Sequence, residues 1–202
     1  ALPAFRAQQL AYQAALAQLA HRLMSLIALS LELPEDYFAK FCRMPSYTLR
    51  LIKYPPHPAN ARFNQLGAGA HTDWGAITLL AQDDCGGLQV KARDGWIEAP
   101  PIADTLVCNI GDMLDRLTGG WYRSTPHRVR NVSGRDRLSF PLFFDPSFDA
   151  VIEPLPERAS AVHDDSAERW DRANVHVFQG TYGAYLLGKV GKVFPDLGRD
   201  VL

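Results

Sequence analysis

Residues 67–83 read GAGAHTDWGAITLLAQD, and this stretch decides the fold and the chemistry that we predict for the chain. It places an imidazole, His71, and a carboxylate, Asp73, two residues apart. Positions i and i+2 of an extended strand share one face, so both side chains can reach one metal ion. The small residues before His71 let the backbone approach closely, as a crowded metal pocket requires. An H-x-D tripeptide also occurs by chance in many proteins, so the pair needs a further ligand before it indicates a site.

That further ligand is predicted to be His127, which lies in the motif STPHRV (residues 124–129) and opens a strand-like run 56 residues after His71. Two histidines and one carboxylate on one side of an ion form the facial triad of non-haem Fe(II) enzymes. This triad leaves coordination positions open for O2 and for a chelating substrate. Zn(II) more often takes a closed tetrahedral set or a third histidine. We therefore predict an Fe(II) site formed by His71, Asp73 and His127.

A candidate carboxylate clamp follows ten residues after His127, where Arg137 and Ser139 share one face of a predicted strand. A guanidinium fork beside a hydroxyl suits a carboxylate that is held by charge-assisted, bidentate hydrogen bonds. A metal ligand and this clamp on neighbouring strands would hold a 2-oxo acid by both ends. Without the triad, Arg137 would instead be interpreted as a solvated strand residue in a surface ion pair.

The region around these motifs is predicted to consist of short β-strands. Turn signals separate the runs, for example at residues 84–87, 93–95 and 133–134. The expected strands are Tyr47–Tyr54, Thr78–Ala81, Gly87–Lys91, Gly95–Glu98, Thr105–Asn109, His127–Val132 and Arg137–Phe144. Many short strands at close spacing are typical of an antiparallel sandwich, jelly roll or barrel.

Helices are predicted at both ends of the chain. From Phe5 to Leu31 the pattern indicates an amphipathic helix packed on a large partner. Its apolar residues recur in steps of three and four, at Tyr12, Leu16, Leu19, Leu23 and Leu26. Pro34 suits the first turn of a second, short helix. A third helix is expected over Thr181–Val190, after a long polar connection at Asp145–Arg172.

Composition argues against several classes of function. Lys plus Arg number 21 and Asp plus Glu 22, so there is no broad basic field for nucleic acid. The most apolar run, about residues 23–33, is too short to span a bilayer. Cys42, Cys85 and Cys108 are odd in number and widely spaced, which argues against a disulfide framework and a thiolate zinc site. No secretory signal precedes the first helix, so we expect a cytoplasmic protein. We also expect a monomer that acts on a small molecule, without a nucleic-acid or membrane partner.

Six motifs, in their order and spacing, make this region resemble a known family. They are YPP (54–56), HTDWGAITLLAQD (71–83), GGLQV (86–90), NIGDML (109–114), STPHRV (124–129) and RLSFPLFFDP (137–146). From about residue 48 to 148 the chain resembles the C-terminal catalytic domain of the isopenicillin N synthase-like 2-oxoglutarate/Fe(II)-dependent dioxygenases. The resemblance implies a mainly β fold with flanking helices, built on a double-stranded β-helix (jelly-roll) core.

The resemblance also implies the metal and the reaction. His71, Asp73 and His127 match the iron ligands of the family. The implied co-substrates are 2-oxoglutarate, which would be converted to succinate and CO2, and O2. A small organic molecule would be oxidised by hydroxylation, desaturation or cyclisation.

Further residues match positions around the co-substrate. Arg137 and Ser139 match the residues that bind the distal carboxylate of 2-oxoglutarate, and Tyr54 matches a tyrosine that often assists. Ile52 stands where several members carry Asn, so contacts there differ. Phe143 shares strand parity with Arg137, and it either faces the pocket to contact an apolar or aromatic substrate or packs in the core.

The remaining motif residues have a structural interpretation. Trp74 and Phe144 are expected to be structural, and Asp112 is expected to be a turn or capping residue. We divide the chain into a helical remnant of an N-terminal region (1–45), the jelly-roll core (46–148) and a C-terminal extension with a covering helix (149–202). Family members carry a longer N-terminal segment that helps to wall the substrate pocket, so we expect a fragment or processed chain, or an unusually open pocket.

The sequence leaves three alternatives open. A non-catalytic jelly-roll binding module would share the strands but would need neither the triad nor the clamp. A zinc hydrolase would keep the triad, but Arg137 and Ser139 would then have no co-substrate to hold. Some members of the family itself oxidise their substrate with Fe(II) but without 2-oxoglutarate, while retaining the Arg-x-Ser pair.

Overall fold

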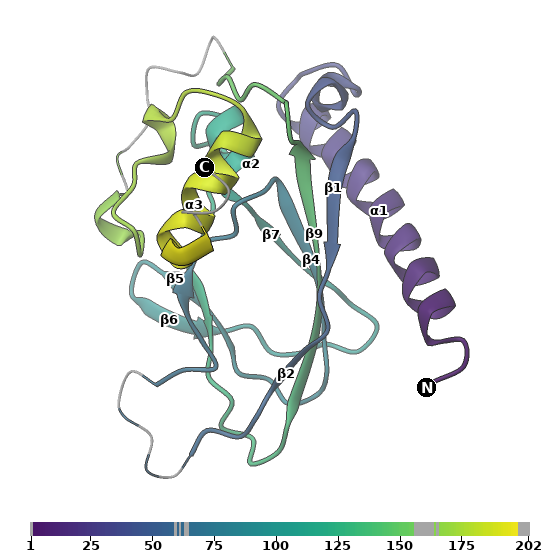
Figure 1. Ribbon diagram of the computed structural model, residues 1–202, viewed down its shortest axis with the longest axis vertical. Coiled ribbons are helices and arrows are strands. Elements are labelled where there is room, and N and C mark those ends of the chain that lie inside the picture. Colours follow the sequence, from purple (N-terminus) through teal and green to yellow (C-terminus); the bar gives the residue numbers. More distant parts are fainter. Residues whose placement is uncertain are drawn as a thin grey trace.

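Two antiparallel β-sheets form the body of the molecule, and helices lie outside them (Figure 1). The computed structural model describes residues 2–58, 60, 62, 65–155, 164 and 166–197. The strands are β1 (Pro45–Leu49), β2 (Ile52–Tyr54), β3 (Ala68–His71), β4 (Ile77–Gln82), β5 (Leu88–Ala92), β6 (Gly95–Glu98), β7 (Val107–Ile110), β8 (His127–Val129) and β9 (Arg137–Ser147). The helices are α1 (Phe5–Ser30), η1 (Tyr37–Phe41), α2 (Asp112–Leu117), η3 (Ser166–Glu168), η4 (Val175–Val177) and α3 (Tyr182–Val193).

The chain alternates between the two sheets. The first sheet has the order β1-β9-β4-β7, with β2 also paired to β9, and the second has the order β3-β8-β5-β6. From β3 to β9 the path therefore crosses from one sheet to the other repeatedly, as in a jelly roll. This arrangement confirms the predicted fold class.

Each predicted strand region overlaps at least one observed strand, but the predicted and observed bounds do not always agree. The expected run Tyr47–Tyr54 is two strands, β1 and β2, which are interrupted at residues 50–51. The short helix α2 was not predicted, because six residues are too few to establish a helical period. Strand β3, with the sequence AGAH, lacks the β-branched residues that usually mark a strand.

Strand β9 separates two environments by the alternation of its side chains. Leu142 and Phe144 are fully buried on the face toward α1, and the Phe144 ring lies 5.0 Å from the His21 ring of that helix. Arg137, Ser139 and Phe143 have the opposite parity, so they face the second sheet. This face of β9 is thus polar at Arg137 and Ser139 and aromatic at Phe143.

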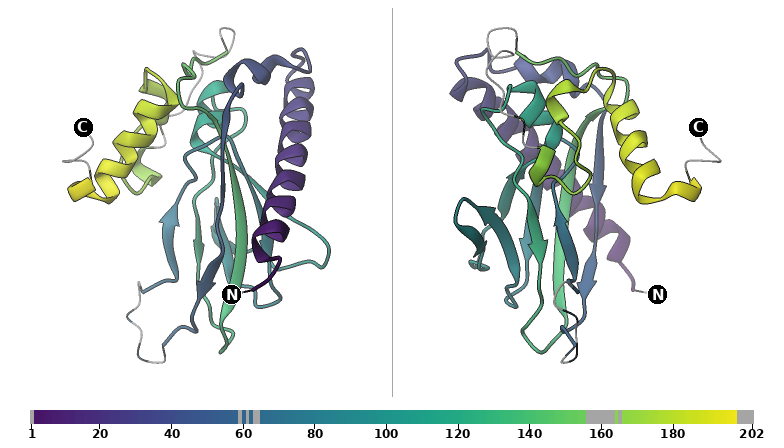
Figure 2. Two further views of the ribbon diagram at one scale, coloured as in Figure 1. Left: turned by 45° about the vertical axis from the view of Figure 1, so that its right-hand side comes forward. Right: turned by 90° about the vertical axis from the view of Figure 1, so that its left-hand side faces the viewer.

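Helix α1 covers the outer face of the first sheet (Figure 2). Its buried residues are Leu16, Ala20, Met24 and Ala28, spaced by four. Of the five residues predicted to face the core, Leu19 and Leu26 are exposed, so the predicted face was partly wrong. The helix is apolar on more than one side, and its small alanines allow the close approach that decides which side packs. None of the described helices combines the length and apolar character that crossing a membrane would require.

The segment that follows β9 is more than a polar connection. Ile152 and Leu155 are buried in the core, and Arg169 is buried as well. Helix α3 begins one residue later than predicted and ends at Val193. It lies on the side of the molecule away from α1 (Figure 2).

Candidate functional site

The two candidate histidines are direct cross-strand partners. His71 ends β3 and pairs in register with His127 at the start of β8. Directly opposed residues of an antiparallel pair present their side chains on the same face. The two imidazole rings accordingly lie 4.4 Å apart between their centroids.

Asp73 lies beyond the end of β3, so the prediction that it shares a strand face with His71 was wrong in detail. Its carboxylate is held by residues of the first sheet, whereas the two histidines belong to the second. Oδ2 accepts hydrogen bonds from the Thr78 hydroxyl at 2.5 Å and from the Asn109 amide at 2.6 Å. Oδ1 is left facing the histidines, 3.8 Å from Nε2 of His71 and 3.7 Å from Nε2 of His127. The three side chains therefore meet between the two sheets.

This geometry fits a divalent metal ion. One donor atom from each of the three residues lies within 4.8 Å of the other two. Two ligands that are each about 2.1 Å from one ion can be at most about 4.2 Å apart, and both carboxylate-to-imidazole distances satisfy this limit.

The orientation of the rings also suits metal binding. Nδ1 of His71 lies 2.7 Å from the Gly69 carbonyl, and Nδ1 of His127 lies 3.2 Å from the Thr125 carbonyl. Hydrogen bonds from both Nδ1 atoms to these carbonyls leave both Nε2 lone pairs free for an ion. Burial lowers the pKa of His127, which favours the neutral imidazole that binds metals.

The Arg137 guanidinium is fully buried and only partly satisfied. Its Nε donates to the Gly86 carbonyl at 2.7 Å, and its Nη2 donates to Oε1 of Gln82 at 2.8 Å. Among the described residues, the buried Nη1 has no hydrogen-bond partner. Burial lowers the pKa of Arg137. A buried cation with a free donor is costly unless an anion joins it, so this group suits a carboxylate ligand.

The other predicted clamp residues lie beside Arg137. Tyr54 is its register partner on β2, and its ring centroid is 5.2 Å from the guanidinium carbon. Ser139 is buried, shares the interior face, and pairs in register with Gln82 on β4. The structure thus brings Tyr54, Arg137 and Ser139 together at one end of β9.

Sequence reasoning missed the residues that position the ligands. Thr78 and Asn109 hold Asp73, and Gln82 together with Gly86 orients Arg137. Gly86 and Gly87 both have positive φ, and a Cβ on Gly87 would lie 2.4 Å from the Arg130 carbonyl oxygen. The sequence did carry a signal for them, because all of these residues lie within the motifs on which the family resemblance rests.

Asp112 is neither a turn residue nor a helix cap, which corrects the sequence interpretation. Gly111 is the N-cap of α2, and Asp112 is completely buried in the first turn. Its carboxylate accepts hydrogen bonds from Arg169 at 2.6 Å, Tyr185 at 2.6 Å and Ser124 at 2.8 Å.

Through its backbone, the same residue reaches the candidate metal site. The Asp112 N–H donates to the Asp73 carbonyl at 2.8 Å. Asp112 therefore connects the C-terminal segment, through Arg169 and Tyr185, with the loop that carries Asp73.

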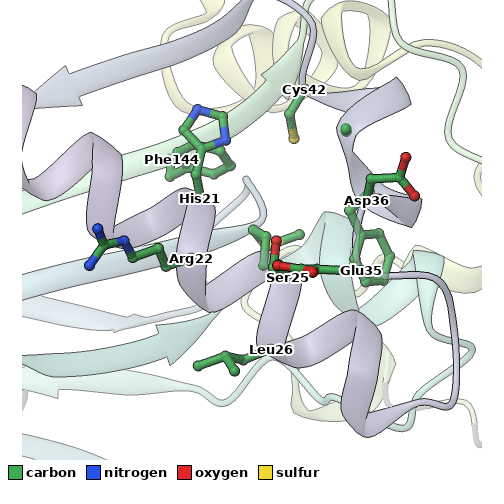
Figure 3. A pocket seen from close by; sticks show the side chains of 11 residues that line it. His21, Arg22, Ser25, Leu26, Glu35, Asp36, Cys42 and Phe144 are labelled. Carbon is green, nitrogen blue, oxygen red and sulfur yellow. The ribbon is translucent and has the colours of Figure 1, made fainter.

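A cavity of about 460 Å³ lies elsewhere, between α1 and the segment that contains η1 (Figure 3). Its walls include His21 and Ser25 of α1, Glu35 and Cys42, and the Phe144 ring. Phe144 is on the α1 side of β9, whereas the candidate ligands are on the other side of that sheet. This cavity is therefore separate from the metal site.

Comparison with known proteins gives a consistent result. A model of the 2OG-Fe(II) oxygenase superfamily matches residues 45–146, about half of the chain. A probable iron/ascorbate oxidoreductase of Dictyostelium discoideum is 50% identical over 216 residues, which cover 98% of this chain and 59% of that protein. A 1-aminocyclopropane-1-carboxylate oxidase of Dictyostelium mucoroides is 42% identical over 212 residues, with 90% and 58% covered.

Solved structures agree with the fold. A full-length Neurospora crassa protein, crystallised in complex with alpha-KG and thymine, superposes with a TM-score of 0.81 at 32% identity. The match covers 96% of this chain and 58% of that chain. The chain thus spans less than two thirds of the length of these similar proteins.

Proposed function

Because the chain belongs to the 2OG-Fe(II) oxygenase superfamily, we propose that it is the catalytic part of a dioxygenase that oxidises a small organic molecule. In this proposal His71, Asp73 and His127 bind Fe(II), and Tyr54, Arg137 and Ser139 bind 2-oxoglutarate. Bound iron would supply the activation of O2, with succinate and CO2 released from 2-oxoglutarate.

One observation carries the proposal. The buried Arg137 has a donor, Nη1, without a partner among the described residues, on the interior face that also holds the metal ligands. A binding module has no need for a buried, incompletely paired cation near three converging ligands. A zinc hydrolase would have no carboxylate to place there.

The side chains would divide the work as follows. Arg137 neutralises the distal carboxylate of 2-oxoglutarate, with Ser139 as an additional donor and Tyr54 closing one side of the guanidinium. Thr78 and Asn109 hold Oδ2 of Asp73, so that Oδ1 stays directed at the ion. Burial of Asp73 and Arg137 excludes water, which strengthens these electrostatic contacts.

A second candidate function is open to the same test. Two of the similar proteins are named as an iron/ascorbate oxidoreductase and a 1-aminocyclopropane-1-carboxylate oxidase. An Fe(II) oxidase of this fold that takes its electrons from ascorbate would use the same triad, without decarboxylating 2-oxoglutarate.

Two measurements separate these functions. Anaerobic addition of 2-oxoglutarate to the Fe(II)-loaded chain should produce a weak visible charge-transfer band, and aerobic turnover should release succinate. Product formation with ascorbate alone, without the band, would indicate the oxidase instead. Absence of both Fe(II) retention and the band would support the binding module.

The Asp73→Ala variant is the control for the metal site. It should lose iron-dependent turnover and the charge-transfer band while retaining a cooperative unfolding transition. Full activity in this variant would remove Asp73 from the ligand set. A monomeric state and a cytoplasmic location are also proposals; the latter is supported by the three cysteines, all of which are free.

A further inference from the structure

A second arginine, Arg50, lies just after the edge strand β1, on the face of the first sheet that is turned toward the second sheet. The Arg50 N–H donates to the Pro141 carbonyl at 3.0 Å, which continues the β1–β9 register beyond Leu49. Tyr47 and Leu49 pack against the core beneath α1, so the alternation places Thr48 and Arg50 on the opposite face, where both are exposed. Arg50 therefore lies on the same side of the sheet as Arg137.

The partner of Arg50 on this face is Phe143. The guanidinium carbon of Arg50 lies 5.6 Å from the centroid of the Phe143 ring. Phe143 is partly exposed and, unlike its neighbours Leu142 and Phe144, is not part of the core cluster beneath α1. Phe143 therefore lies outside the core beneath α1, on the face of the first sheet that also carries Arg137 and Ser139.

The register places this pair next to the metal ligands. Phe143 pairs directly with Thr78 on β4, and Thr78 is the residue whose hydroxyl donates to Asp73. Neighbouring strands are about 4.8 Å apart, and directly opposed side chains are in contact range. Phe143 is therefore one strand away from a residue that touches a candidate iron ligand.

The charge of Arg50 is not neutralised within the described part of the chain. Lys53 and Arg135 each have a carboxylate partner, Asp136 at 2.7 Å and Asp84 at 2.6 Å. Over the same described residues, Arg50 is exposed and forms no ion pair. A guanidinium stacked on an aromatic ring keeps its hydrogen-bonding edge available for a planar anion.

We propose that Arg50 and Phe143 form the substrate subsite, and that the oxidised substrate is a small carboxylic acid with an apolar body. The carboxylate binds the edge of Arg50, and the apolar body lies against Phe143, beside the metal. Arg137 is not available for this role, because it lies at the start of β9, three same-face positions away from Phe143, and because it is assigned to 2-oxoglutarate. The inference rests on the proposed function, in which the co-substrate occupies Arg137.

The test compares acids with their amides on the anaerobic chain loaded with Fe(II) and 2-oxoglutarate. The probes are phenylacetate, indole-3-acetate and hexanoate, each with its amide, and the dissociation constants are measured by calorimetry. At least one acid should bind about tenfold or more tightly than its amide, as expected for a hydrogen bond to a charged group. In Arg50→Gln this preference should disappear, and in Arg50→Lys it should be partly restored.

Lys53→Gln is the matched control, because it removes the same charge from the same chain segment on the outward face. It should keep the preference for the acid. Phe143→Ala should weaken the binding of acid and amide alike, since it removes apolar contact rather than charge.

The proposal is overturned if no acid binds more tightly than its amide, or if Arg50→Gln retains the preference. The charge-transfer band is recorded in the same samples, so the two proposals can fail separately. A normal band without acid preference contradicts only the subsite, and acid preference without a band contradicts only the use of 2-oxoglutarate.

Discussion

The hydroxyl of Thr78 donates a 2.5 Å hydrogen bond to Oδ2 of Asp73. A residue of the first sheet thus orients a carboxylate whose other oxygen faces two histidines of the second sheet. Hydrogen bonds of this kind fix the direction of a metal ligand, and their loss weakens metal binding.

Thr78→Val keeps the shape of the side chain but removes this donor. We expect the dissociation constant for Fe(II) to rise about 10- to 100-fold, because among the side chains that the structure describes only the Asn109 amide would still donate to Oδ2 of Asp73. Thr48→Val makes the same chemical change on the same face of the sheet, at an exposed position, and should bind Fe(II) normally because Thr48 is two strands away from Thr78. Equal affinities in the two variants would show that Thr78 does not position the ligand.

Arg137→Lys keeps the positive charge but loses the planar fork. The apparent Michaelis constant for 2-oxoglutarate should rise about tenfold or more, since a point charge cannot form the bidentate bonds of the guanidinium. The measurement is succinate release at varied 2-oxoglutarate, with Fe(II) saturating. An unchanged constant would mean that the distal carboxylate binds elsewhere.

The sequence was sufficient to select the candidate ligands that the structure brings together, but not the residues that hold them in place. His71, Asp73, His127 and Arg137 lie in motifs whose order is informative by itself. The partners Thr78, Asn109 and Gln82 depend on the register among β4, β7 and β9, and a hydrophobic pattern does not define register between strands that are distant in sequence.

Two other errors come from tertiary contacts that the sequence pattern does not show. The contact between Arg169 and Asp112 joins residues 57 positions apart, so the polar sequence around Arg169 looked like a connection. In α1, apolar residues occur on several sides, so the periodicity did not reveal that the alanine-containing face packs on the sheet.

Asp112→Asn should strongly destabilise the fold. The carboxylate is completely buried and pairs with Arg169 at 2.6 Å, with Lys189 at 3.8 Å. Removing one member of a buried ion pair typically costs about 3–5 kcal/mol, because the remaining charges lose their compensation. Chemical denaturation measures this change.

Asp136→Asn is its control, since it breaks an ion pair of similar length, with Lys53 at 2.7 Å, at the surface. Exposed pairs contribute only about 0–1 kcal/mol, so this variant should unfold almost as the parent chain does. A similar loss in both variants would contradict the structural role of the buried network.

Asp145→Asn should change stability in a pH-dependent way. Burial raises the pKa of Asp145 to about 6, from its ordinary value of 3.8. Between these two values the folded protein holds a proton that the unfolded chain has released, so the stability of the metal-free protein falls as the pH rises from about 4 to 6. Asparagine has no charge to bury, so the Asp145→Asn substitution should raise the free energy of unfolding at pH 7.5, where the aspartate is ionised. It should have little effect at pH 4, where the folded protein already holds Asp145 protonated.

The expected gain at pH 7.5 is about 1–2 kcal/mol, because partial exposure of the carboxyl lets solvent screen part of the effect of the pKa shift. Asp149→Asn, at an exposed position four residues later, should show no such difference between the two pH values. Denaturation of the metal-free chain at both pH values makes the comparison. A stabilisation by Asp145→Asn that is equal at pH 4 and 7.5 would show that the charge of Asp145 is not its cause.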